Sequence, residues 1–197
     1  MRVILASASK SRANMLRAAG VPYEIIPADV DEESVKATLR REGASAQKCA
    51  ETLAEFKAVK VSQNRPADLV IGADQMLECE GAWFDKPRGL EGVRSHMLQL
   101  RGKVHTLPTS VAVALNGAVI WHHSAAPCMT VRDFSGAFLD AYVAEVGEAV
   151  TSSVGAYHLE GRGAQLFTKI DGDFFTILGL PLLELLAFLR EHQVVAR

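Results

Sequence analysis

The sequence predicts an α/β protein with a mixed sheet, arranged as one domain or as two small lobes around a cleft. In the first half of the chain, short apolar segments alternate with amphipathic ones, as strands and helices do in α/β folds. Further along, the pair Asn116-Gly117 lies between two alternating segments and predicts an antiparallel hairpin. The 197 residues suffice for a sizeable core, because a chain of this size buries roughly 70% of its unfolded surface.

Local start and stop signals define the elements of the first half. Val3–Ala6 is a short run that is apolar on both faces, which is typical of a buried strand. A helix over Lys10–Ala19 follows, and Gly20 and Pro22 favour its termination. The next predicted elements are a strand, an acidic loop, a Ser-capped helix and a strand, over Tyr23–Pro27, Asp29–Glu33, Ser45–Val61 and Leu69–Ile71.

The second half is predicted to contain more antiparallel pairs. Met76–Phe84 is expected to form a hairpin around Glu80-Gly81, where turn residues separate two apolar segments. Two long strands flank Asn116-Gly117, and three helices and a further strand complete the set. The ranges are Val104–Ala114 and Ala118–Val131 for the long strands, Gly89–Gln99, Ser135–Glu145 and Leu182–His192 for the helices, and Ala164–Ile170 for the last strand.

Composition argues against several function classes. A net charge of −2 disfavours a nucleic-acid polymer as the main ligand. Cys49, Cys79 and Cys128 are widely spaced and form no CxxC pair, so a zinc knuckle or a disulfide framework is not expected. The apolar stretch Ile177–Leu189 contains Glu184 and is shorter than the ~20 residues that span a bilayer. We therefore expect no membrane association and a cytoplasmic location.

Hydroxyl and cationic side chains gather at the junction of the first strand and the first helix. Ser7, Ser9 and Ser11 alternate there with other small or charged residues, and Lys10 and Arg12 supply positive charge. The unpaired N–H groups and the dipole of a helix start favour anions, and a guanidinium is able to grip phosphate with two hydrogen bonds. The alternative is a serine-capped helix with solvated charges. The absence of glycine excludes a Walker A loop or a dinucleotide-binding turn.

Two acidic residues are candidates for catalysis and metal binding. Asp74 follows the strand Leu69–Ile71, where side chains face the crevice in which α/β proteins bind ligands. There it is able to hold Mg²⁺ or to act as a general base on water, and the alternative is an aspartate of a turn. Glu32, in the acidic loop, is able to join Asp74 around a metal, and its alternative is a solvated charge.

Two lysines and two polar residues complete the candidates. Lys57 lies near the apolar face of its helix, so its ammonium either meets a phosphate or reaches past the core into solvent. Lys86 precedes Pro87, which favours an extended backbone, and the chain is expected to return there to the same crevice. Gln75 and Glu160 are candidates for reading the edge of a base by hydrogen bonds.

Taken in order, these motifs resemble those of the Maf family of nucleoside triphosphate pyrophosphatases. The resemblance covers essentially the whole chain, residues 1–197, as a single domain with two lobes around a cleft. The matching motifs are Leu5-Ala6-Ser7-Ala8-Ser9-Lys10-Ser11-Arg12, Val30-Asp31-Glu32, Phe56-Lys57-Ala58, Gly72-Ala73-Asp74-Gln75, Lys86-Pro87, Gly155-Ala156-Tyr157, Glu160-Gly161-Arg162-Gly163-Ala164 and Gly179-Leu180-Pro181.

The resemblance implies hydrolysis of a nucleoside triphosphate between its α- and β-phosphates, with a divalent cation, Mg²⁺ or Mn²⁺. It also implies a mixed, elongated sheet flanked by helices with a central cleft, akin to the inosine triphosphate pyrophosphatases, and a homodimer. The implied roles are catalysis for Asp74, phosphate binding for Ser7, Arg12, Lys57 and Lys86, and metal binding for Glu32 and Asp74.

Base specificity is implied to depend on Ser11, Gln75 and Glu160. The family usually has Ser-Pro-Arg-Arg where this chain has Ser9-Lys10-Ser11-Arg12, so its first arginine is replaced by serine. Gln75 with Glu160 resembles the branch that prefers 7-methyl-GTP, although that branch commonly has Trp at the position of Ser11. The alternatives are a dTTP/UTP pyrophosphatase of the same family and a non-catalytic, nucleotide-binding regulator of cell division.

Overall fold

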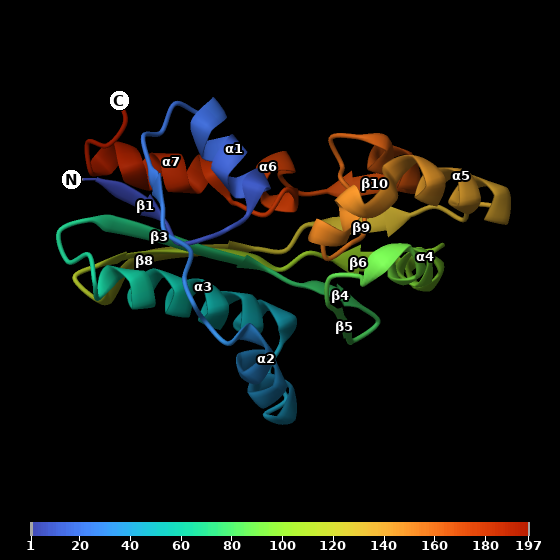
Figure 1. Ribbon diagram of the computed structural model, residues 1–197, viewed down its shortest axis with the longest axis horizontal. Coiled ribbons are helices and arrows are strands. Elements are labelled where there is room, and N and C mark those ends of the chain that lie inside the picture. The colour runs from blue at the N-terminus through green and yellow to red at the C-terminus, as the bar shows by residue number, and fades with distance from the viewer. Residues whose placement is uncertain (1, 197) are drawn as a thin grey trace. The chain divides into compact units, whose positions relative to one another are not determined.

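The computed structural model describes residues 2–196, and the chain divides into two compact units, each with its own sheet (Figure 1). Unit 1 takes in the chain up to Gln75, the segment Pro108–Ala125 and the chain from Asp173 onward. Unit 2 takes in Met76–Leu107 and Ala126–Gly172. Within residues 2–196, none of the helices is both long enough and apolar enough to cross a bilayer.

The sheet of unit 1 is mixed, as the sequence predicted. Its strand order is β2-β1-β3-β7-β8. β1 pairs in parallel with β2 and β3, whereas β3, β7 and β8 pair antiparallel. The bounds are Val3–Leu5 for β1, Glu24–Ile25 for β2, Leu69–Gln75 for β3, Thr109–Leu115 for β7 and Ala118–Ala125 for β8.

Helices cover both faces of this sheet (Figure 1). On one face, Leu16 and Leu185 pack with Leu5, Ile71 and Val113 of the strands in the main core. These two leucines belong to α1 and α7, while α3 covers the opposite face, and α2 and α6 lie in connecting segments (Figure 1). The bounds are Lys10–Ala18 for α1, Glu32–Arg41 for α2, Ala46–Ser62 for α3, Phe174–Ile177 for α6 and Leu182–Glu191 for α7.

Alternation along β3 decides which of its side chains reach α3. Ile71 and Ala73 belong to the core on the α1 and α7 side. Because successive side chains of a strand point to opposite faces, Gly72 and Asp74 point toward α3. The approach is close at Gly72, where a Cβ atom would lie 2.2 Å from the carbonyl oxygen of Ala54 and 2.6 Å from the nitrogen of Ala58. Glycine at position 72 therefore lets α3 settle onto the strand that carries Asp74.

We expect Gly72→Ala to lower the free energy of unfolding by about 3 kcal/mol, at the upper end of overpacking costs, because backbone must move to admit the methyl group. The movement would also shift α3 relative to Asp74 and reduce activity. Urea unfolding measures the effect, and Gly136→Ala is the control, since a Cβ there meets nothing within 4 Å. Equal stability of the two variants would contradict the close approach.

Unit 2 is built on a second, wholly antiparallel sheet of order β10-β9-β6-β4-β5. Its strands are β4 Leu77–Cys79, β5 Ala82–Phe84, β6 Val104–Thr106, β9 Cys128–Val131 and β10 Phe167–Asp171. Its helices are α4 Gly89–Leu100 and α5 Gly136–Val146, with the 3₁₀ turns η1 Gly147–Ser152 and η2 Arg162–Leu166.

The core of unit 2 contains a buried polar pair. His105 Nε2 lies 2.7 Å from the hydroxyl of Tyr157, and both residues are buried. Burial lowers the pKa of His105 to about 4, so the imidazole is neutral near pH 7. The hydroxyl of Tyr142 donates to the carbonyl of Ala156 at 2.9 Å. This hydrogen bond holds Ala156 in its backbone conformation, which has a positive φ of 56°.

The α/β class is confirmed, and the strands are divided between two sheets. Each of the two long predicted strands is interrupted before a proline, at Leu107-Pro108 and at Ala126-Pro127, and the parts belong to different sheets. Proline has no N–H to donate to a ladder, which explains the break. The Asn116-Gly117 hairpin is confirmed, with φ of 51° and 76° at its two turn residues. The expected central cleft stays a prediction.

Candidate functional site

Asp74 lies inside a strand, and the prediction that it follows the strand was wrong. β3 continues to Gln75 because β7 pairs with it along this stretch, with Asp74 opposite Ser110. The apolar run that ends at Ile71 did not reveal this extension, since Gly72 and Asp74 are weak strand formers that tertiary pairing overrides. Asp74 is consequently buried, with 6% of the residue exposed, on the face that α3 covers.

The ammonium of Lys57 lies between two carboxylates. Its Nζ is 2.6 Å from Asp74 Oδ1 and 2.7 Å from Glu32 Oε1. The side chains of Lys57 and Asp74 are 8% and 9% exposed, whereas that of Glu32 is 42% exposed. An ammonium group is buried only where partners compensate for its lost hydration. Lys57 therefore does not extend into solvent. Its ammonium joins Asp74 of β3 and Glu32 of α2 in one charged group.

Glu32 is the first residue of a helix, so the prediction of an acidic loop over Asp29–Glu33 was wrong in its second half. Asp31 caps the helix, its Oδ1 accepting from the nitrogen of Ser34 at 3.1 Å. An aspartate cap followed by acidic residues in the first turn is a recognisable start signal that was missed. The helix start fixes the backbone of Glu32, and its carboxylate reaches Lys57.

Arg12 is held by hydrogen bonds at the start of α1. Its Nε donates to the carbonyl of Gly179 at 2.8 Å and its Nη1 donates to Ser7 Oγ at 3.2 Å. Ser9 caps the helix, accepting from the nitrogen of Arg12 at 3.4 Å. The serine cap and the arginine contact thus coexist, and the buried hydroxyl of Ser7 orients the guanidinium.

The charge of Arg12 interacts with the same two carboxylates. Burial lowers the pKa of Arg12, and the nearby charges of Asp74 and Glu32 oppose that shift. Arg12, Lys57, Glu32 and Asp74 therefore form one group, called here the charged cluster, with two cations and two anions. The cluster offers both positive groups for phosphate oxygens and hard carboxylate oxygens for a divalent cation.

Two predicted specificity residues of unit 1 bind one turn. Gln75 Nε2 donates to the carbonyls of Thr176 and Ile177, and Ser11 Oγ donates to the carbonyl of Leu178. The sequence did not indicate this turn, because the helix before it, α6, spans only the four residues Phe174–Ile177.

The remaining two candidates lie in unit 2. Lys86 is exposed in the loop between β5 and α4, and Glu160 is exposed just before η2. Seven of the predicted residues are thus placed in unit 1, where hydrogen bonds and charge link them to one another or to the turn at residues 176–179. The roles of all nine residues stay predictions.

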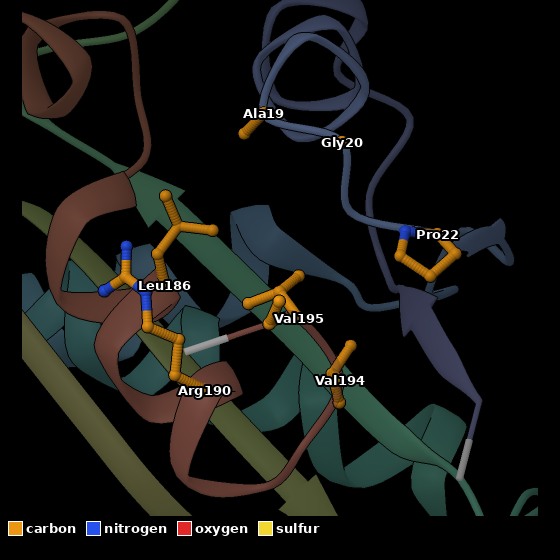
Figure 2. Close-up of a pocket in the computed structure, with 8 residues that line it drawn as sticks. Ala19, Gly20, Pro22, Leu186, Arg190, Val194 and Val195 are labelled. Atoms are coloured by element: carbon orange, nitrogen blue, oxygen red, sulfur yellow. The ribbon is translucent and has the colours of Figure 1, made fainter.

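A separate hollow in unit 1 involves none of the predicted residues (Figure 2). It is bordered by the C-terminal end of α1 and by α7 and the chain after it. Its lining consists of Ala19, Gly20, Pro22, Leu186, Arg190, Val194, Val195 and Ala196. Arg12 of the charged cluster lies at the N-terminal end of α1, whereas this hollow lies at its C-terminal end, so the hollow is not the candidate site.

Fold and site together define an α/β protein in which a serine-capped helix start carries an arginine beside a lysine-bridged pair of carboxylates, an arrangement whose chemistry suits phosphorylated ligands. The chain belongs to the Maf family, whose model, described as Maf-like protein, matches residues 2–192. The resemblance found in the motifs is therefore confirmed.

Similar proteins align over nearly their whole length. A nucleoside triphosphate pyrophosphatase of Granulibacter bethesdensis is 53% identical over 99% of both chains. One of Paramagnetospirillum magneticum is 52% identical, over 96% of this chain and 97% of its own. A 7-methyl-GTP pyrophosphatase of Brucella abortus is 43% identical, over 99% of this chain and 98% of its own.

Proposed function

We propose that this protein is a nucleoside triphosphate pyrophosphatase, which hydrolyses a nucleoside triphosphate to a nucleoside monophosphate and pyrophosphate. The observation that carries the proposal is the charged cluster in a chain of the Maf family. Water adds to the α-phosphorus, the bond to the oxygen that bridges the α- and β-phosphates breaks, and pyrophosphate leaves. The relatives named above carry the same activity in their names.

In this reaction Asp74 is the general base, which takes the proton of the attacking water. Its carboxylate is kept in place by Lys57 at 2.6 Å. Arg12 and Ser7 bind phosphate oxygens, since the guanidinium has further N–H groups besides those that donate to Gly179 and Ser7. Positioned cations of this kind stabilise the charge that develops on transferring phosphate groups.

The residues of the cluster fit a divalent cation that is bound with the substrate. Glu32 and Asp74 both direct a carboxylate oxygen at the same nitrogen, so the two oxygens lie close together. Within residues 2–196, no group of three or more acidic, histidine or cysteine residues is placed to hold a metal. Sparse carboxylates completed by substrate phosphates are typical of Mg²⁺. The cation would supply charge neutralisation on the phosphates.

For the substrate, we propose a preference for methylated or other noncanonical purine nucleotides, with 7-methyl-GTP as the leading candidate. Gln75 together with Glu160 supports it, and so does the Brucella relative. Ser11 is a predicted specificity position at which this chain departs from the family pattern, so the pyrimidine alternative is included in the test. The expected homodimer and cytoplasmic location also remain predictions.

The test is pyrophosphate release by the purified protein from 7-methyl-GTP, GTP, ITP, dTTP and UTP. We expect release from at least the purine nucleotides with Mg²⁺ or Mn²⁺, loss of release with EDTA, and recovery when the cation is restored. Full activity in EDTA would contradict the metal proposal. Nucleotide binding without release from any of the five would favour the non-catalytic regulator.

A further inference from the structure

Four consecutive backbone carbonyls, those of residues 176–179, accept hydrogen bonds from side chains predicted for the nucleotide site. We call this segment the carbonyl turn. The bonds run from Gln75 Nε2 to Thr176 O and Ile177 O at 3.1 Å each, from Ser11 Oγ to Leu178 O at 3.0 Å and from Arg12 Nε to Gly179 O at 2.8 Å.

The carbonyl turn fixes which end of the Gln75 amide is available. Carbonyl oxygens only accept, so the nitrogen of the amide must face Thr176 and Ile177. The same nitrogen donates to Thr109 Oγ1 at 2.8 Å. Its two hydrogens thus serve three acceptors, and none is left for a ligand. Gln75 therefore has only its Oε1 to offer.

That oxygen is not fully buried. Among residues 2–196, the buried side-chain nitrogen and oxygen atoms without a partner belong to His105 and Arg162. Oε1 of Gln75 is not one of them, and no donor in that part of the chain bonds to it, so it is not buried.

Gly179 has both this oxygen and the guanidinium of Arg12 as neighbours. A Cβ atom at Gly179 would lie 3.8 Å from Gln75 Oε1 and 3.6 Å from Nε and Nη2 of Arg12. The glycine has a positive φ of 104°, which L side chains rarely adopt. An acceptor that is not fully buried and the guanidinium therefore lie on the same side of Gly179, where a side chain is missing.

The hydroxyl of Thr109 connects the amide of Gln75 to the carbonyl turn by two hydrogen bonds. It is fully buried, and its hydroxyl accepts from Gln75 while it donates to the carbonyl of Thr176 at 3.3 Å. A residue without exposed surface does not touch a nucleotide. Any effect of its hydroxyl on substrate choice must pass through Gln75 or through the turn.

We propose that Thr109 and the carbonyl turn are positioning elements that make Gln75 an acceptor-only group, so that the site selects bases whose edge presents N–H donors. This inference rests on the proposed function. Guanine presents two donors on its Watson–Crick edge, N1–H and the 2-amino group, hypoxanthine presents N1–H alone, and unsubstituted purine presents neither.

The first test uses the unaltered protein and three triphosphates, GTP, ITP and purine riboside triphosphate. We expect kcat/KM to be highest for GTP or ITP and lower for purine riboside triphosphate by about threefold to tenfold, the size of one hydrogen bond. Equal or higher kcat/KM for purine riboside triphosphate would overturn the inference.

The second test asks whether Thr109 acts through Gln75. Thr109→Val keeps the shape and removes the hydroxyl, and Thr109→Ser is the conservative control. We expect Val to reduce the preference for ITP over purine riboside triphosphate by about threefold, and Ser to restore it. A merely structural role would lower kcat/KM equally for both nucleotides.

A double-mutant cycle completes the test, with Gln75→Leu as the second substitution. In the Gln75→Leu background, Thr109→Val should leave the preference unchanged, and a threefold change there would overturn the inference.

If Thr109→Val does not fold, as judged by its melting temperature, Thr109→Ala replaces it. The order of kcat/KM for the three triphosphates in the unaltered protein then decides whether the inference holds. Activity without the expected ranking refutes only this inference, whereas no pyrophosphate from any triphosphate refutes the proposed function.

Discussion

Asp74→Asn should lower kcat by a factor on the order of 10² to 10⁴, the range for loss of a positioned general base. The amide keeps the size of the side chain and an oxygen that accepts from Lys57, so the cluster should stay assembled. It does not take a proton from water at neutral pH. Pyrophosphate release under saturating substrate and cation measures kcat, and calorimetric titration with a nonhydrolysable triphosphate analogue should show binding that is little changed.

The matched control is Asp171→Asn, an exposed aspartate of β10 in unit 2. It removes the same charge without touching the charged cluster, and its kcat should equal that of the unaltered protein. If Asp74→Asn also retained full turnover, Asp74 would not be the base.

Lys57→Met should lower the free energy of unfolding by about 3–5 kcal/mol, the usual cost of removing one partner of a buried ion pair. The thioether side chain fills the volume of the lysine stem, but it leaves the carboxylate of Asp74 buried without its cation. Activity should fall as well, because Glu32 and Asp74 would no longer be held around one nitrogen. Urea unfolding with a constant m-value measures the loss.

Two further variants separate the ion pair from other effects. Lys48 lies on the exposed side of the same helix, so Lys48→Met should leave the free energy of unfolding almost unchanged. Combining Lys57→Met with Asp74→Leu removes both buried charges, and should recover most of the stability but none of the activity. A Lys57→Met variant as stable as Lys48→Met would show that the pair contributes little.

Local chemistry in the sequence predicted much of unit 1 correctly. Ser45 caps α3 as expected, accepting from the nitrogen of Lys48 at 3.1 Å, because a serine before an apolar helix has few alternatives. The junction from Ser7 to Arg12 was likewise predicted, since strand, cap and helix follow one another within a few residues. The partners of Arg12 could not be predicted, because Gly179 is far along the chain.

What the sequence did not reveal depends on pairing between distant segments. β3 extends through Asp74 only because β7 lies beside it. Lys57 and Asp74 are in contact because Gly72 allows α3 to approach β3 closely. No local pattern in the sequence indicates this contact between distant segments. Thr109 resembles any strand threonine until its neighbours Gln75 and Thr176 are known.

Product analysis by ³¹P NMR tests the central claim most directly. The protein is incubated with GTP and Mg²⁺, and the spectrum is followed over time. The proposed function predicts that resonances of pyrophosphate and GMP grow together in equal amounts, without GDP, and that Asp74→Asn slows both. Formation of GDP and orthophosphate would contradict cleavage between the α- and β-phosphates.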